Sequence, residues 1–195
     1  MQIEIPEIHG SGELWLEIMR VICGDTPNHP ASNMCDLMCH RAPYTPLLGF
    51  KERTYVDIQN REFDFPEEKG YFTHMDVFEF MKVCGVDYDL MICSDGIEHL
   101  TKEQGEELLW WMDIHSDKQV IFTPLGEYML TEDKHPDSHR SGWTPELLPD
   151  YLSIVFPDFH PTLGVGAFFA VNCSGIEKER ILHEIKNKYE QSRIS

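Results

Sequence analysis

The chain has 195 residues, of which 42% are hydrophobic and 11% aromatic, and it carries a formal net charge of −18. This composition is typical of a folded protein with a substantial core and excludes an intrinsically disordered chain. The excess of negative charge repels polyanions, so binding to bulk nucleic acid is disfavoured.

The sequence also indicates where the protein works. No apolar run approaches the roughly 18 residues that a membrane-spanning helix needs. The first residues, MQIEIPE, lack the basic start and apolar stretch of a signal peptide. The six cysteines form no CxxC pair, which favours reduced, partly buried thiols. We therefore expect an acidic cytoplasmic protein without a membrane segment.

The first half of the chain reads as a helix followed by short strands. Residues 11–23 have helical apolar periodicity with Ser11 as N-cap, and residues 24–33 read as a Pro-rich loop. Strands are predicted over 34–38, 54–58 and 71–75, with a brief helical turn at 45–50 and a helix over 76–84.

The second half continues the alternation. A strand over 89–94 precedes a helix that begins at Thr101, whose capping box is completed by Gln104. Leu108, Leu109 and Met112 form the buried stripe of that helix, and we expect Trp110 and Trp111 to pack in the core with them.

The end of the chain closes the pattern. Residues 119–123 form the next strand, and Thr144-Pro145-Glu146 marks a helix start. Strands over 151–156 and 167–172 pair like a hairpin, and a last helix begins at Ser174. This order predicts one doubly wound α/β domain, with an N-terminal helix and loop at 1–33, a core at 34–173 and a C-terminal helix at 174–195.

Four aspartates follow or close apolar runs at intervals of 21, 19 and 19 residues: Asp36, Asp57, Asp76 and Asp95. An interval near twenty matches one strand plus one crossover of a parallel sheet. Ligands of such sheets bind beyond the carboxyl ends of the strands. We therefore expect four carboxylates along one rim, where they meet the hydroxyl and amino groups of a nucleoside.

With these residues, the chain resembles the class I S-adenosylmethionine-dependent methyltransferases over about residues 11–173. The resemblance implies a mostly parallel seven-stranded sheet with an antiparallel terminal strand. It places Asp57 at the ribose and Asp76-Val77 at the adenine of S-adenosylmethionine. The segment Ser94-Asp95-Gly96-Ile97-Glu98-His99-Leu100 is similar to the fourth-strand motif of the subgroup with Glu-His after the strand.

The sequence departs from the family in its glycine-rich first motif, which falls at residues 35–42. Asp36 keeps its place, but Met38, His40 and Ala42 stand where the family has glycines. Glycine permits positive φ and close backbone approach, so we expect the loop to keep its carboxylate and lose its shape around the methionine end of the cofactor.

His99 is the expected catalytic base, because it follows the fourth strand at the ligand rim and an imidazole titrates near neutral pH. The alternative for this residue is a helix cap or a partner of Glu98. Residues 125–143 are the expected lid, and Trp143 a wall or anchor of it.

A metal site is the second interpretation of the same region. Asp95, Glu98 and His99 follow a D-x-x-E-H spacing, and His139 lies on the expected lid. This set looks like the metal-dependent 2′-O-methyltransferases of small-RNA ends, which have Glu where this chain has Asp95. A cation bound there would lower the pKa of the attacking hydroxyl.

The remaining candidates are ordinary. His135 is expected to be an exposed loop histidine. Arg41 and Arg140 are the cations nearest the expected cleft. Each either contacts a carboxylate of the cofactor or substrate or is an ordinary surface residue.

Our principal interpretation is metal-free methyl transfer to an oxygen or nitrogen of a small molecule. A methyltransferase-like binding module without activity is the runner-up, since it explains the missing glycines. A dinucleotide oxidoreductase is disfavoured because no G-x-G-x-x-G follows the first strand.

Overall fold

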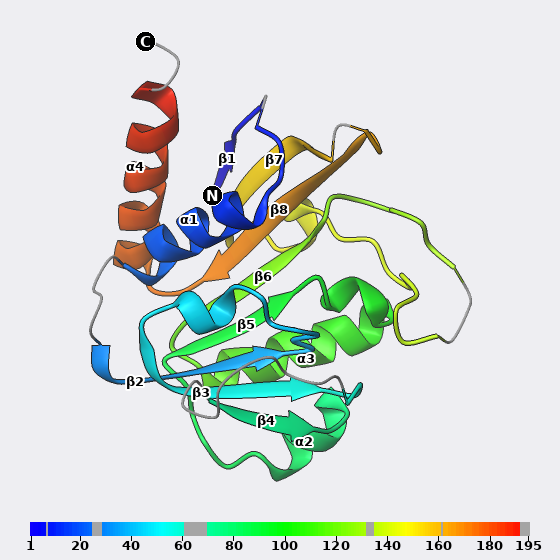
Figure 1. The fold of residues 1–195 in the computed structure, drawn as a ribbon. Coiled ribbons are helices and arrows are strands. Elements are labelled where there is room, and N and C mark those ends of the chain that lie inside the picture. Colours follow the sequence, from blue (N-terminus) through cyan, green and yellow to red (C-terminus); the bar gives the residue numbers. More distant parts are fainter. Residues whose placement is uncertain (7, 25–28, 61–69, 132–134, 161, 192–195) are drawn as a thin grey trace.

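The computed structural model describes residues 1–6, 8–24, 29–60, 70–131, 135–160 and 162–191. Within them, one eight-stranded sheet runs in the order β1-β7-β8-β6-β5-β2-β3-β4 (Figure 1). The strands are β1 (Gln2–Glu4), β2 (His29–Leu37), β3 (Phe50–Asp57), β4 (Tyr71–His74), β5 (Leu90–Ser94), β6 (Gln119–Pro124), β7 (Leu152–His160) and β8 (Val165–Asn172).

The strand directions confirm the predicted doubly wound α/β fold. All described neighbours pair in parallel except β8, which is antiparallel to both β6 and β7. The prediction missed β1, which pairs with β7 and makes the sheet eight-stranded. Gln2–Glu4 contains a single apolar residue, Ile3, so no local periodicity marks it as a strand.

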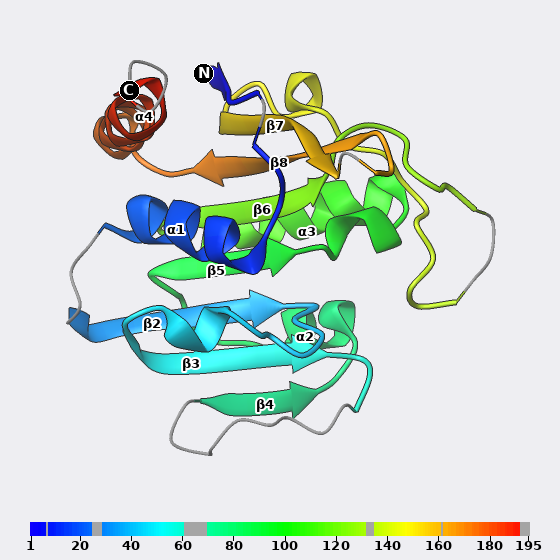
Figure 2. The same ribbon diagram turned by 45° about the horizontal axis from the view of Figure 1, so that its top comes forward.

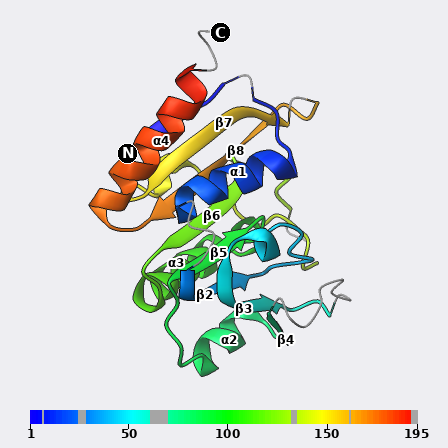
Figure 3. The same ribbon diagram turned by 60° about the vertical axis from the view of Figure 1, so that its left-hand side comes forward.

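Helices cover both faces of the sheet (Figure 2). On one face lie α1 (Gly12–Cys23) and α4 (Gly175–Gln191), and on the other α2 (Val77–Val83) and α3 (Lys102–His115). Helices α1 and α4 pack side by side (Figure 3), and the Arg180 guanidinium of α4 donates hydrogen bonds to the Val21 and Ile22 carbonyls of α1.

Local capping explains where these helices begin. The Ser11 hydroxyl accepts a hydrogen bond from the Leu14 amide, as the sequence predicted for α1. The capping box of Thr101 and Gln104 is present at α3. The predicted helix at Thr144 is only the one-turn helix η4 (Pro145–Leu147), and the turn at 45–50 is η1 (Thr45–Leu47).

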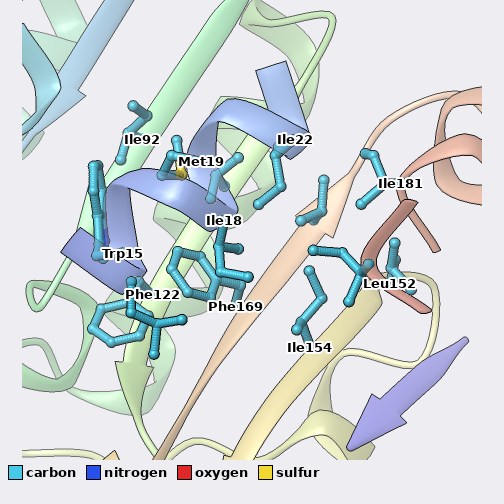
Figure 4. Packing of buried hydrophobic residues seen from close by; sticks show 14 of the residues in the cluster. Trp15, Ile18, Met19, Ile22, Ile92, Phe122, Leu152, Ile154, Phe169 and Ile181 are labelled. Atoms are coloured by element: carbon cyan, nitrogen blue, oxygen red, sulfur yellow. The ribbon is translucent and has the colours of Figure 1, made fainter. Parts of the chain in front are cut away.

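Two hydrophobic clusters lie on the two faces. Ile18, Met19 and Ile22 of α1 are fully buried against the sheet (Figure 4). On the opposite face, Leu108 and Met112 of α3 are fully buried in the second cluster. Because both faces are covered, the central strands are apolar without interruption rather than alternating.

One core prediction was wrong. Trp111 is 5% exposed and packs against Phe80, but Trp110 is 63% exposed on the outer side of α3. The six cysteines are all free. Among the helices of the described residues, none has the length and apolar character to cross a membrane.

Candidate functional site

The loop after β2 keeps a glycine-like backbone without glycines. Met38, His40 and Ala42 have φ values of 56°, 48° and 42°, in the left-handed region. An L-residue in this conformation costs about 1–2 kcal/mol, so the surrounding structure must hold it. The expectation that the loop loses its shape was therefore wrong at the level of the backbone.

Two long-range contacts hold this loop. The His40 amide donates to Asp57 Oδ2 at 2.7 Å, and the Cys39 amide donates to the Val56 carbonyl at 3.0 Å. Gly96, after β5, makes room for the non-glycine side chain: a β-carbon there would lie 3.0 Å from the Met38 Cβ. The end of β3 therefore fixes the loop of β2.

Asp36 lies beneath this loop as a buried carboxyl group with a partner on only one side. Its side chain is 2% exposed, and the Thr45 hydroxyl donates to Oδ2 at 2.7 Å. Oδ1 is buried and has no hydrogen-bond partner. Burial raises the pKa of Asp36 to about 7, and the nearby Asp57 adds to the effect.

A cavity of about 510 Å³ lies over Asp36. Its walls come from the start of α1, the loop after β2, and the ends of β5, β6 and β7. The lining residues are Gly10, Ser11, Gly12, Trp15, Asp36, Cys39, His40, Arg41, Ala42, Pro43, Tyr44, Thr45, Ser94, Asp95, Phe122, Phe159 and His160. We call it the large cavity.

A second cavity of about 80 Å³, the small cavity, lies on the β3–β4 side. Its lining includes Asp57, Asp76 and Val77 as well as Met38. Both cavities share His40 and Asp95, so they adjoin.

The two acids of the small cavity also stabilise its walls. Asp57 Oδ1 accepts a hydrogen bond from the Gln59 amide at 2.7 Å, in addition to its bond with the loop. Asp76 is the N-cap of α2 and accepts hydrogen bonds from Phe78 and Glu79. A carboxylate has about four lone-pair sites, so neither acid is saturated by these contacts.

Part of the expected lid closes the small cavity. Pro136 and Asp137 line it, and Gln59 Nε2 donates to Asp137 Oδ1 at 2.7 Å. The segment between β6 and β7 leaves the sheet at the edge where β2, β3 and β5 end (Figure 2). Residues 132–134 of the expected lid lie outside the described residues.

Glu98, His99 and His139 form a compact group of possible metal ligands. Each offers one ligand atom, and these atoms lie within 4.8 Å of one another. Glu98 and His99 belong to the one-turn helix η3 (Ile97–His99) after β5, and the two histidine rings are 5.0 Å apart. Asp95, the fourth candidate, is not part of this group.

Backbone carbonyls orient both histidines. His99 Nδ1 lies 3.3 Å from the Ser138 carbonyl, and His139 Nδ1 lies 2.9 Å from the Tyr128 carbonyl. A carbonyl only accepts, so each Nδ1 carries the proton and each Nε2 keeps a lone pair. Burial, with a smaller contribution from His139, lowers the pKa of His99, which favours this neutral form.

Glu98 is the buried member of the group. It is 3% exposed, and the Thr123 hydroxyl donates to its Oε2 at 3.0 Å. Burial raises the pKa of Glu98 to about 8, and the charge of Asp95 raises it further. Its carbonyl accepts the amides of Arg140 and Ser141, which ties the lid segment to η3.

No protein-family model matches the sequence, and no curated protein sequence matches it. Solved structures do match. N-methyltransferase NodS from Bradyrhizobium japonicum, in complex with S-adenosyl-L-homocysteine, aligns with a TM-score of 0.58 at 12% identity, over 82% of this chain and 84% of that chain. The methyltransferase domain of bacterial CtHen1-CN aligns with a TM-score of 0.52 at 16% identity, over 82% and 97% of the two chains. This chain has the class I methyltransferase fold.

A further solved structure matches over part of its own length. The small RNA methyltransferase HEN1 aligns with a TM-score of 0.54 at 17% identity, over 83% of this chain and 26% of that chain. These likenesses establish the methyltransferase fold, to which β1 adds an eighth strand.

The other candidate residues named from the sequence have the following positions in the structure. The Ser94 hydroxyl lines the large cavity and accepts the Trp15 indole N–H at 3.1 Å. Arg41 lines the same cavity, whereas the Arg140 amide binds the Glu98 carbonyl. Trp143 is 1% exposed and packs in the core cluster of α3. His135 is exposed, as the sequence predicted.

Sequence reasoning missed the aromatic walls of the large cavity. Trp15, Phe122 and Phe159 lie far apart in the chain, so no local pattern brings them together. The only signal of a different role is Gly10-Ser11-Gly12 before α1, where two glycines flank the N-cap.

Proposed function

We propose that the chain binds S-adenosylmethionine across the two adjoining cavities. The methionine end lies in the large cavity beside the loop 38–42, where Asp36 Oδ1 accepts its ammonium group. The ribose and adenine lie at Asp57, Asp76 and Val77 and extend beyond the small cavity, whose volume of about 80 Å³ encloses only part of them. The observation that supports this placement is the loop backbone, which keeps positive φ at all three positions normally held by glycine.

The retained loop also weighs against an inactive binding module. A left-handed backbone at three residues other than glycine is strained. Such strain persists only where the surrounding contacts fix it, and it clusters at functional sites. Asp36 adds a buried oxygen with no partner, which is costly unless a ligand donates to it.

We further propose that Glu98, His99 and His139 hold a divalent cation that assists methylation of a hydroxyl oxygen. Imidazole and carboxylate are ligands of Mn²⁺, Mg²⁺ and Zn²⁺. Metal-ligating histidines characteristically donate their other ring N–H to a carbonyl or carboxylate, as both do here. Three ligands leave coordination positions open for the acceptor and for water.

The chemistry needs little from the protein beyond placement. S-adenosylmethionine supplies an activated methyl group, and a bound cation would lower the pKa of the acceptor hydroxyl. Asp57, Asp76 and the loop hold the cofactor in place. Without a cation, His99 is the candidate base, with Nε2 as the nitrogen that is not turned toward the Ser138 carbonyl.

The metal site is tested with a matched pair of histidines. Wild-type protein should melt at a higher temperature with Mn²⁺, because a ligand of the folded state stabilises it. His139→Ala and Glu98→Gln should lose this increase, and His135→Ala should keep it because that exposed side chain lies outside the group. An equal increase in His139→Ala and His135→Ala would dismiss the site and return His99 to the role of base.

The cofactor site is tested separately by calorimetry with S-adenosylhomocysteine. Wild-type protein and the surface variant Asp150→Ala should bind it, and Asp57→Ala should not. Undiminished binding in Asp57→Ala refutes the ribose assignment. No heat from the wild-type protein at millimolar ligand favours the binding module.

A further inference from the structure

The large cavity has walls of aromatic rings on the side away from Asp57 and Asp76. Trp15 projects from α1 and Phe122 from β6 (Figure 4), and Phe159 near the end of β7 completes the wall. The rings of Phe122 and Phe159 are 5.2 Å apart at 59°, and those of Trp15 and Tyr44 are 6.0 Å apart at 33°. A volume of about 510 Å³ lies within the range of drug-sized ligand sites and exceeds what the short methionine end of the cofactor fills.

These rings are fixed rather than loosely packed. The Trp15 indole is anchored by its hydrogen bond to Ser94, beside the shared residue Asp95. A β-carbon at Gly10 would overlap the Phe159 ring, and one at Gly12 would overlap Tyr44. The Gly-Ser-Gly turn before α1 thus lets two rings approach the chain closely, and we call the part of the large cavity among the aromatic rings the slot.

The charges around the slot disfavour an anionic occupant. Asp36 and Asp95 line the cavity, and the whole chain carries a net charge of −18. The cation in the lining is Arg41, which is exposed and lies on the loop that the cofactor's carboxylate approaches. A phosphate chain would meet repulsion here, whereas an uncharged ring would not.

From these contacts we propose that the acceptor is an uncharged aromatic small molecule with a ring hydroxyl. Its ring lies among Trp15, Phe122 and Phe159, and its hydroxyl faces Ser94 and Asp95 at the boundary of the two cavities. This inference rests on the proposed methyl transfer. In the reaction an oxygen–methyl bond forms as the sulfur–methyl bond of S-adenosylmethionine breaks, and the sulfonium becomes a neutral thioether. The hydroxyl proton passes to His99, which lines the adjoining small cavity, or to solvent where a cation is bound.

The test uses 1-naphthol as a probe, with its binding followed by fluorescence with and without S-adenosylhomocysteine. Wild-type protein should bind 1-naphthol at least about tenfold more tightly than cyclohexanol or 1-naphthol-4-sulfonate, because neither comparison probe is both aromatic and uncharged. Trp15→Leu should weaken binding about tenfold or more, and Trp110→Leu, which removes an exposed indole outside the cavity, should leave it unchanged.

A second variant covers the case in which Trp15→Leu does not fold. Tyr44 is 38% exposed at the rim of the cavity, so Tyr44→Leu should fold and still weaken 1-naphthol binding. Equal binding of the three probes, equal affinities in Tyr44→Leu and Trp110→Leu, or displacement of 1-naphthol by a short RNA at lower concentration would overturn the proposal.

Loss of the aromatic acceptor and loss of methyl transfer give different binding results. Binding of S-adenosylhomocysteine without binding of 1-naphthol removes the aromatic acceptor and leaves the methyltransferase proposal intact. Binding of 1-naphthol without S-adenosylhomocysteine refutes methyl transfer and leaves an aromatic-ligand site.

Discussion

The substitution Asp36→Asn tests whether the buried carboxyl group of Asp36 lowers the unfolding free energy, as expected of a group that serves ligand binding rather than folding. Asp36 is 2% exposed, and burial raises its pKa from 3.8 to about 7. A raised pKa means that the folded state binds this proton more tightly than the unfolded state does. Folding therefore loses stability as pH rises from about 4 to 7, where the unfolded chain ionises and the folded chain does not.

The size of the effect follows from the two pKa values. The full difference corresponds to a free energy on the order of 4 kcal/mol, of which about 3 kcal/mol falls between pH 5 and pH 8. Asparagine removes this dependence. Its amide N–H groups lack partners beside Thr45, at a cost of about 1–3 kcal/mol that does not change with pH. The variant should thus gain about 3 kcal/mol relative to wild type between pH 5 and pH 8.

The assay is urea unfolding of both proteins at several pH values, with Asp150→Asn as an exposed control. The difference in unfolding free energy between Asp36→Asn and wild type should rise over this range, and that of the control should stay constant. If cofactor binding is as proposed, the same variant should bind S-adenosylhomocysteine more weakly. A constant difference for Asp36→Asn would refute the assignment of a costly buried carboxyl.

Three further changes follow from single contacts. His40→Gly should raise the unfolding free energy by up to about 1 kcal/mol, since relief of the positive φ outweighs the added freedom of the unfolded chain. A lower unfolding free energy in urea would show that contacts of the His40 side chain stabilise the protein by more than the positive φ costs. Trp111→Ala should cost about 3–5 kcal/mol and Trp110→Ala less than about 1 kcal/mol, measured by the same method, because only the first ring is buried. Thr123→Val should lower Mn²⁺ affinity in calorimetry about 10–100-fold by removing the hydrogen bond that orients the Glu98 carboxylate; unchanged affinity would exclude that carboxylate as a ligand.

Much of the fold could be predicted from the sequence, because the patterns that mark its helices and strands each span only a few residues. Ser11 and the Thr101–Gln104 pair mark helix starts within a single turn, so their positions need no knowledge of the rest of the chain. The spacing of the four aspartates indicates the strand-plus-crossover repeat of a parallel sheet, whereas the order of the strands, with β2 between β3 and β5, comes only from the tertiary structure. Local pattern failed at Trp110, because it falls between the buried pairs Leu108–Leu109 and Trp111–Met112 and so lies on the opposite side of α3.

The candidate site depends on contacts that no local pattern specifies. The loop 38–42 holds its conformation because Asp57, 17 residues away, accepts the His40 amide. His139 reaches Glu98 and His99 only because the segment after β6 folds back over η3. The sequence by itself determined which elements form and which acids follow the strands, since propensity and apolar spacing act over a few residues. Tertiary structure alone decided the strained loop, the ligand group and the aromatic slot, since each is made by side chains that meet across the sheet edge.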